Sequence, residues 1–210
     1  MKGKNVKHQR IAFERIKMSA QSTKEKILQT ALELFATQGF DATSTRQIAQ
    51  KAGANLSAIS YHFGSKEGLY KAVFLRCFEC IKNIIKNAPP KPLDALSHYA
   101  LQMGALHQKE PFIARFFIAT ITSPKPFMKD IFTQCQSQIL AFFMDALKQG
   151  IENGDFKKDL NIQSAIISFI SIVNFFFFIA HTDALPQGFD TLKNSYAANA
   201  LDIFLNGIKA

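Results

Sequence analysis

The chain has 210 residues, of which 48% are hydrophobic and 20% are charged. This balance excludes a disordered or collagen-like chain and is sufficient for a substantial folded core. The formal charge is +9, and it is uneven: residues 1–80 hold 13 basic and 6 acidic side chains, whereas residues 81–210 hold 12 and 10. The basic first part predicts a polyanionic partner.

The phenylalanines show the opposite distribution, and the number of cysteines narrows the class of protein further. The chain has 21 Phe, 4 Tyr and no Trp, and 15 of the Phe residues follow position 111. Three cysteines are too few for a disulfide scaffold and are typical of a reducing compartment. Because Met1–Lys26 is Lys-rich and lacks an apolar segment, we expect no secretion signal and a cytoplasmic location.

The sequence predicts an all-α fold, because apolar residues recur three and four positions apart and no stretch alternates with period two. Residues 1–22 have no clear apolar face and are predicted to form a loose basic arm. A first helix is expected over about residues 23–38, ended by Gly39 as its C-cap.

Three more elements follow in the basic part. Ser44 and Gln47 have the spacing of a capping box, which predicts a second helix over about residues 45–52, ended by Gly53. A third short helix is expected over about 56–62. A long fourth helix is expected from about residue 66 to residue 87, where a cluster of prolines ends it.

The remaining chain predicts five helices, giving about nine in total. Their expected spans are residues 92–108, 111–122, 126–152, 162–182 and 189–207. The longest apolar run, Ala165–Ala180, is 16 residues and would measure about 24 Å as a helix, short of the ~30 Å hydrocarbon core of a bilayer. We therefore expect a buried helix and no membrane partner.

The second and third helices have the spacing of a helix-turn-helix, with Ile48, Ala49, Ala52 and Ile59 as its small core and Gly53 at the turn. The start of the second helix offers backbone N–H groups, hydroxyls and a guanidinium to a phosphate. The third helix presents short and polar groups that suit base edges and flanking phosphates. The candidate DNA contacts are Ser44, Thr45, Arg46, Ser57, Ala58, Ser60, Tyr61, His62 and Lys66.

Residues 27–70 resemble the N-terminal domain of the tetracycline-repressor (TetR) family of bacterial transcription regulators. The matching segments are Ala31-Leu32-Glu33-Leu34-Phe35, Gly39-Phe40, Thr43-Ser44, Ile48-Ala49, Ala52-Gly53 and Tyr61-His62-Phe63-Gly64-Ser65-Lys66-Glu67-Gly68-Leu69. The sequence departs from the common family pattern at one position, where Ser60 stands in the slot of a tyrosine and the aromatic residue is displaced to Tyr61.

The resemblance implies a basic arm at residues 1–22, a three-helix DNA-binding domain at 23–70, and a helical effector-binding and dimerisation domain at 71–210. It also implies a homodimer on a palindromic operator of double-stranded DNA. The expected function is a repressor, cytoplasmic and nucleoid-associated in a bacterium, that a small hydrophobic ligand releases from its operator. This expectation includes no catalytic residues, cofactor or metal.

The second part of the sequence supports this arrangement independently. Its last two helices are apolar over more than one face, which predicts a dimer interface at Ile172, Phe176, Ile179, Tyr196, Ala200 and Phe204. The Phe-rich middle predicts a mostly apolar ligand pocket with few polar groups. The candidate pocket residues are Met103, His107, Phe112, Phe116, Phe117, Phe132, Phe143, Phe169 and Asn174.

Two alternatives keep the same fold. One is a DNA-bound architectural or partner-protein factor without a small-molecule effector. The other is a thiol- or metal-responsive regulator, because Cys77 and Cys80 stand three residues apart on one helix. An enzyme is not expected, since the sequence has no nucleophile elbow, P-loop, zinc-protease motif or Gly-rich dinucleotide turn.

Overall fold

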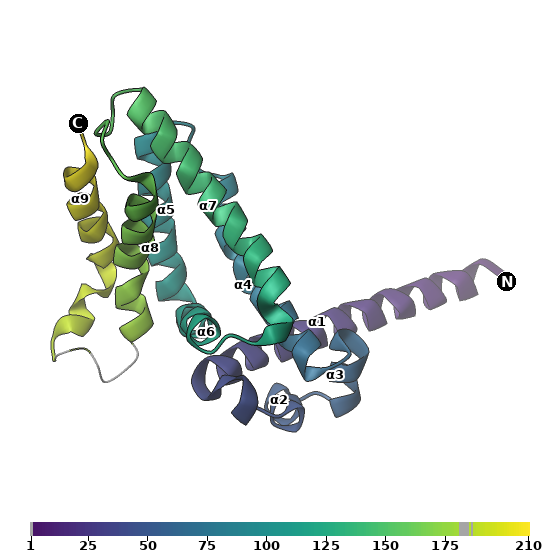
Figure 1. Cartoon of the computed structure of the whole chain (residues 1–210). Coiled ribbons are helices and arrows are strands. Elements are labelled where there is room, and N and C mark those ends of the chain that lie inside the picture. Colours follow the sequence, from purple (N-terminus) through teal and green to yellow (C-terminus); the bar gives the residue numbers. More distant parts are fainter. Residues whose placement is uncertain (1, 181–184, 186) are drawn as a thin grey trace. The chain divides into compact units, whose positions relative to one another are not determined.

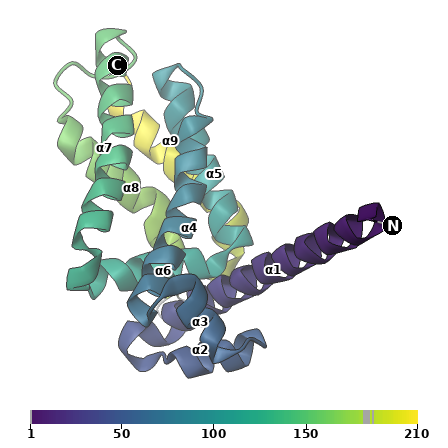
Figure 2. The same ribbon diagram turned by 90° about the vertical axis from the view of Figure 1, so that its right-hand side faces the viewer.

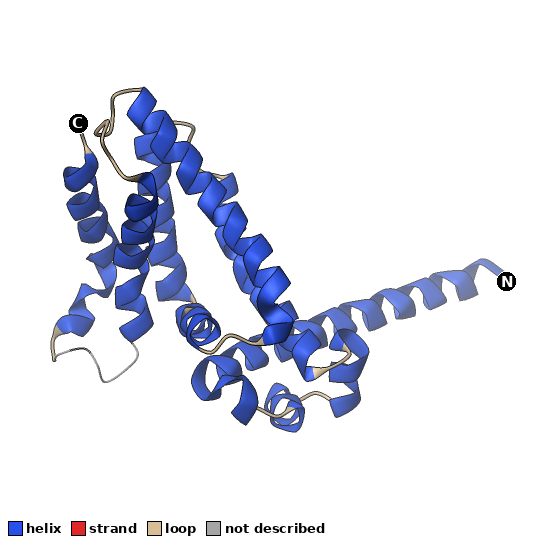
Figure 3. Cartoon of the chain, viewed as in Figure 1, coloured by secondary structure: helices blue, strands red, loops and turns tan. Residues whose placement is uncertain are grey.

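The structure is a computed structural model that describes the backbone of residues 2–180, 185 and 187–210, and the side chains of residues 22–180, 185, 187–189, 191, 192 and 194–210. Within these residues the chain forms nine α-helices, two short 3-10 helices and no strand beyond one isolated bridge between Phe156 and Lys209 (Figure 3). The predicted all-α fold class is confirmed. The chain divides into two compact units, one ending at Phe74 and one beginning at Leu75, whereas the boundary predicted from the sequence lies at residue 70.

The first unit contains α1 (Lys2–Ala42), α2 (Thr45–Ala52), α3 (Leu56–Phe63) and the first part of α4 (Lys66–Lys86). Helices α1, α2 and α3 contact one another pairwise (Figures 1 and 2). The backbone leaves helical geometry at Gly39, where φ is 79°, which agrees with the predicted C-cap. The spans of α2 and α3 match the predicted ones within one residue.

The loose arm predicted for residues 1–22 is corrected by the structure, in which α1 already begins at Lys2. No amphipathic stripe marks this segment, which is why a helix was not expected. However, Lys, Gln, Arg, Glu, Ala and Met, which make up much of this segment, are among the residues that a helix accommodates at little cost.

The second unit is built around α5 (Pro92–Lys109), which contacts α6 (Pro111–Thr122), α7 (Lys129–Glu152), α8 (Ile162–Ile179) and α9 (Tyr196–Ile208) (Figures 1 and 2). Proline occupies the first turn of α5 and of α6, where its missing N–H costs no intrahelical bond. The fully buried side chains of Leu96, Phe143 and Phe169 lie in the core between these helices.

Two predicted helices of this unit are each divided in the structure. A 3-10 turn, η1, at Pro126–Met128 precedes α7, and a 3-10 helix, η2, at Phe189–Asn194 precedes α9. The predicted last helix therefore bends at Ser195, which separates η2 from α9. The last predicted turn of α8, at residues 181 and 182, lies outside the described residues.

Helix α8 is the one helix of the described part of the chain that is long and apolar enough to cross a bilayer. In this fold its Phe169 and Val173 are buried in the core cluster of the second unit. It packs against α5, α6, α7 and α9, as the core helix of a helical domain does.

Candidate DNA-binding interface

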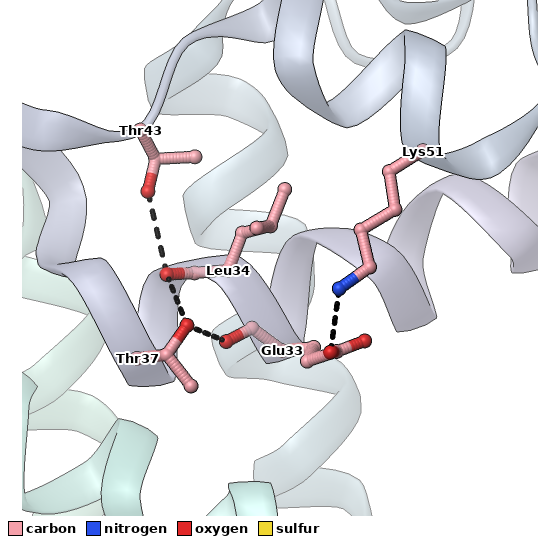
Figure 4. A network of polar contacts seen from close by, with 5 residues as sticks. All are labelled: Glu33, Leu34, Thr37, Thr43 and Lys51. Atoms are coloured by element: carbon pink, nitrogen blue, oxygen red, sulfur yellow. Dashed lines mark hydrogen bonds and ion pairs between the residues drawn. The ribbon is translucent and has the colours of Figure 1, made fainter.

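A short polar network joins α1 to α2 (Figure 4). The hydroxyl of buried Thr43 donates to the carbonyl oxygen of Gly39 at 2.7 Å and lies 3.4 Å from that of Leu34. The Thr37 hydroxyl donates to the Glu33 carbonyl at 2.8 Å, and the Lys51 ammonium lies 2.6 Å from the Glu33 carboxylate. The Lys51–Glu33 ion pair thus holds the last turn of α2 against α1, and the Thr43 hydroxyl holds the link before α2 to α1, whereas the Thr37 bond lies within α1.

The start of α2 is fixed by the predicted capping box. The Ser44 hydroxyl accepts from the Gln47 backbone N–H at 3.2 Å, and the Gln47 side-chain oxygen accepts from the Ser44 N–H at 2.8 Å. Thr45 and Arg46 follow this cap, and the Arg46 side chain is exposed. The first turn of α2 therefore presents a guanidinium, a hydroxyl and the positive end of a helix, the groups that bind phosphate oxygens.

The turn between α2 and α3 has the conformation that the sequence predicted. Gly53 adopts φ 62° and ψ 33°, the left-handed conformation that glycine tolerates without a Cβ clash. Asn55, which was not among the predicted site residues, then caps α3 by accepting from the Ser57 N–H at 3.1 Å. An Asn directly before an apolar residue is a recognised helix-start signal and was available in the sequence.

Helix α3 has one buried anchor and one exposed face. Ile59 is buried in the first unit together with Ile48 and Ala49 of α2, whereas Ala52, the fourth residue of the predicted small core, is half-buried. Tyr61 is 83% exposed, and its ring makes an edge contact with the His62 ring at 4.9 Å between centroids. Ser57 and Ser60 are exposed as well, while Ala58 and His62 are half-buried.

Lys66 has a different environment from the other predicted contacts. Its ammonium lies 4.3 Å from the centre of the Phe40 ring and 3.5 Å from the Asp41 carbonyl oxygen. The Phe40 ring in turn lies 5.2 Å from that of Tyr70 on α4. Lys66 thus ties the end of α1 to the start of α4, and a phosphate would have to compete for its ammonium.

Comparison with known proteins matches the same segment. Residues 27–73 fit the family model described as bacterial regulatory proteins, tetR family. The negative transcriptional regulator IcaR of the biofilm operon icaADBC of Staphylococcus aureus (strain Newman) is 28% identical over 143 residues, which are 64% of this chain and 76% of IcaR. The chain belongs to the TetR family.

Two solved TetR-like structures share the fold. The ketosteroid transcriptional regulator KstR2 of Mycobacterium tuberculosis aligns with a TM-score of 0.73 and 21% identity, over 89% of this chain and 95% of KstR2. A tetR-family regulatory protein from Rhodococcus RHA1 aligns with a TM-score of 0.75 and 21% identity, over 90% of this chain and 97% of that protein. These two structures show the fold alone, whereas the family model and the similarity to IcaR identify this TetR-family chain as a transcriptional regulator with a helix-turn-helix. Members of the family bind operator DNA as dimers and often bind small molecules.

The predicted pocket residues of this TetR-family chain do not gather in one place. Met103, Phe143 and Phe169 are buried in the core of the second unit, where the Phe143 and Phe169 rings lie 5.4 Å apart. Phe116 is fully buried, and Phe112 and Phe117 are half-buried on α6. These Phe rings therefore include core residues, and the assignment of Met103, Phe116, Phe143 and Phe169 to one ligand cavity stays a prediction.

A groove lies elsewhere in the second unit and includes one predicted pocket residue, Phe132. Its volume is about 390 Å³, and it is open to solvent on one side. The lining is mainly apolar and comes from the end of α6, the following loop, η1 and the start of α7: Thr120, Ile121, Pro124, Lys125, Pro126, Met128, Lys129, Phe132 and Thr133.

Two predicted polar pocket residues are brought together by the fold. His107 of α5 and Asn174 of α8 are both buried, and the His107 Nε2 lies 2.9 Å from the Asn174 Oδ1. Both residues were predicted from the sequence, but their pairing was not, because 67 residues separate them in the chain.

Of the six predicted dimer residues, three lie in the interior of the chain itself. Phe176, Ala200 and Phe204 are buried within the chain itself: Phe176 stacks on Tyr196 at 4.5 Å between ring centroids, and Phe204 lies 4.8 Å from Phe169. The half-buried Tyr196 donates to the Ile172 carbonyl at 2.7 Å, and Ile172 and Ile179 are also half-buried.

The large apolar side chains that α8 and α9 leave exposed are not the predicted ones, although two of them, Phe175 and Ile203, are sequence neighbours of predicted residues. Ile167 and Phe175 of α8 are 62% and 58% exposed, and Ile203 of α9 is 65% exposed. The sequence could not separate them from the core residues, since both faces of these helices are apolar.

The cysteine pair lies on α4. Cys77 is buried and Cys80 is half-buried, and both are free thiols. Burial raises the pKa of Cys77 to about 12, which keeps this thiol protonated and unreactive at neutral pH. Among the described residues, His, Cys, Asp and Glu side chains form no group of three that suits a metal ion.

Proposed function

We propose that this TetR-family chain is a repressor that binds a palindromic operator as a homodimer and is released by a small hydrophobic effector. The observation that carries the DNA-binding part is the exposed polar face of α3, a helix capped by Asn55 and anchored by buried Ile59. A recognition helix needs this combination, because its register in the major groove depends on a rigid support. A regulator of this kind acts in the bacterial cytoplasm, on the nucleoid.

The candidate contact residues divide into two roles. Arg46 and Thr45, at the capped start of α2, contact phosphates and set the orientation of the domain. Ser57, Ser60 and Tyr61 on α3 face the base edges, with Ala58 against a thymine methyl and His62 and Ser44 against the flanking backbone. The face of α3 carries little charge, so affinity comes mainly from phosphate contacts and specificity from short hydrogen-bonding groups.

The proposed dimer forms through the exposed face of α8 and α9. Ile167, Phe175 and Ile203 would otherwise leave large apolar side chains in water, and their burial between two copies supplies the driving force for association. A dimer with two-fold symmetry matches the symmetry of a palindrome, whose half-sites lie about 34 Å apart, one turn of the duplex.

Release by an effector follows as a shift between two states of the dimer. In one state the distance between the two recognition helices matches the half-sites of the operator, and in the other state it does not. A ligand that binds more tightly to the second state lowers the fraction of dimers that can bind the operator. Helix α4 begins in the DNA-binding unit and ends in the second unit, so a change in either unit reaches the other through a continuous helix. The apolar groove and the buried His107–Asn174 pair are the candidate contacts for a hydrophobic ligand with few charges.

A second function is favoured by one observation: Met103, Phe143 and Phe169 fill the core between α5, α7 and α8. Core side chains at the predicted pocket suit a DNA-bound factor that responds to a partner protein and not to a small molecule.

Duplexes selected from a random pool, and footprints on the DNA upstream of the chain's own gene, test the DNA-binding proposal. We expect a palindromic motif protected by a dimer. Arg46→Ala should weaken binding and lower the slope of log K against log salt by about 0.9 for each phosphate that the variant no longer neutralises. The control is Lys148→Ala, which removes an exposed charge from α7.

Unchanged affinity and slope in the Arg46 variant would overturn the phosphate assignment. For the effector, neutral apolar compounds are added to the footprinted complex. Release by at least one of them supports the effector-responsive repressor, whereas retention of the complex with all of them supports the second function.

A further inference from the structure

The His107–Asn174 pair belongs to a small polar cluster inside the apolar second unit, which also includes the hydroxyl of buried Tyr99 beside the Asn174 side chain. Both side chains are buried, and the His107 ring lies against aromatic rings of α8, 5.0 Å from Phe177 and 6.4 Å from Phe178 between centroids. Burying polar side chains in an apolar interior is costly unless their hydrogen-bonding groups are satisfied, so each donor and acceptor of this pair needs a partner.

The hydrogen bonds of Asn174 determine which nitrogen of His107 carries the proton. The Asn174 Nδ2 donates to the Ile170 carbonyl oxygen at 2.8 Å, so this atom is the NH₂ group and the Oδ1 is the acceptor. The His107 Nε2 lies 2.9 Å from that Oδ1 and must therefore be the donor. Burial also lowers the pKa of His107, although the bond to Asn174 acts against this shift, and the ring is neutral at pH 7. Its Nδ1 is then a bare acceptor.

This acceptor has no hydrogen-bond partner. The His107 Nδ1 is the one side-chain nitrogen or oxygen, among those of the described residues, that is shielded from solvent and makes no hydrogen bond. A trapped water would satisfy it only if two to four polar groups surrounded the water, whereas the rings of Phe177 and Phe178 beside His107 are apolar. An apolar molecule that carries one donor group fits these surroundings better than water does.

We propose that the Nδ1 of His107 accepts a hydrogen bond from a hydroxyl or N–H group of the effector, whose remaining body is apolar. This inference rests on the effector-responsive function proposed above and specifies the chemical class of ligand. A carboxylate or an ether offers no proton to Nδ1, so the site selects neutral alcohols, phenols and amides. His107 is therefore a specificity-determining residue, and Asn174 is the positioning residue that sets its tautomer.

The buried position of Nδ1 also links binding to a rearrangement. Because this atom is sealed from solvent, a donor group reaches it only when the rings of Phe177 and Phe178 or the helices α5 and α8 move. A ligand bound there stabilises the rearranged state, which is the property that an effector needs.

The test compares two probes that differ in one hydrogen-bond donor, 4-butylphenol and its methyl ether 4-butylanisole, by calorimetric titration of the full chain without DNA. We expect the wild-type chain to bind the phenol about tenfold more tightly than the ether. His107→Gln keeps a side-chain amide near the position of Nε2 and removes the Nδ1 acceptor. This variant should therefore bind the phenol and the ether with about equal affinity. The matched control is His98→Gln, a half-buried histidine of the same helix, which should keep the preference.

A nitrogen-15 spectrum of the His107 ring gives a second readout that does not depend on folding of a variant. We expect the Nε2-protonated tautomer in the free protein and a shift of the Nδ1 signal when the phenol binds. Equal binding of the two probes, no binding of either, or a preference that survives His107→Gln would overturn the proposal.

These outcomes are separable from failure of the proposed function. If the phenol preference depends on His107 but the phenol does not release footprinted DNA, the ligand site stands and effector release fails. If other apolar compounds release the DNA while the phenol preference is absent, the repressor proposal stands and the role of His107 fails.

Discussion

The Lys66 ammonium lies 4.3 Å from the centre of the Phe40 ring, between the end of α1 and the start of α4. It also lies 3.5 Å from the Asp41 carbonyl oxygen. A lysine in the segment following a recognition helix is expected from its charge to contact phosphate. Its position in this structure indicates that it stabilises the DNA-binding unit through a cation–π contact.

Lys66→Met should therefore lower the free energy of unfolding of the first unit by about 1 kcal/mol, because the variant places no cation over the Phe40 ring. Lys66→Arg should retain most of the stability, since a guanidinium also binds an aromatic face. Urea denaturation monitored by circular dichroism measures both effects. The salt dependence of DNA binding should not change in Lys66→Met; a slope lowered by the equivalent of about one phosphate would instead assign Lys66 to the DNA.

The neighbouring residues Ile203 and Phe204 have different roles: Ile203 belongs to the proposed dimer interface and Phe204 to the core. Ile203→Lys places a charge on a side chain that is 65% exposed, so we expect dissociation of the dimer with little loss of monomer stability. Phe204→Ala removes a buried ring that contacts Phe169, so we expect a loss of roughly 3 kcal/mol of stability. Light scattering after gel filtration and thermal denaturation measure the two effects. A dimer that persists in Ile203→Lys would place the interface on another surface.

The thiols should differ in reactivity. Because burial raises the pKa of Cys77 to about 12, this residue should react with a disulfide reagent at pH 8 only after unfolding, whereas the half-buried Cys80 should react first. Mass spectrometry of the labelled peptides distinguishes the two sites. We also expect mild peroxide to leave DNA binding unchanged. Rapid labelling of native Cys77, or release of DNA by peroxide that Cys77→Ala prevents, would support the thiol-responsive alternative.

The buried His107 predicts a dependence of stability on pH. Burial lowers its pKa below the ordinary 6.5, so the unfolded chain binds a proton near pH 6.5 while the folded chain does not. This proton uptake does not affect stability well above pH 6.5. Below pH 6.5 it favours the unfolded chain, so the free energy of unfolding falls as the pH decreases. Urea denaturation at pH 7.5 and 5.5 should show a smaller loss for His107→Gln than for the wild-type chain. Equal losses in the two proteins would mean that His107 is already protonated when folded.

The sequence by itself determined the local elements of the DNA-binding unit. The capping box of Ser44 and Gln47, the turn at Gly53 and the buried Ile59 all depend on contacts within a few residues or on a short motif. Local hydrogen bonds and the need for a positive φ are properties that a sequence pattern states directly. The same pattern was sufficient to indicate the family.

The packing of the helices on one another separates the apolar side chains of the core from those that face solvent. Phe204 and Ile203 are adjacent and both apolar, yet one packs on Phe169 and the other faces solvent. The orientation of a helix that is apolar on all sides depends on its neighbours, because its periodicity does not single out one face. Likewise, the pairing of His107 with Asn174 arises from the packing of α5 on α8, across 67 residues of chain, and no local pattern encodes it.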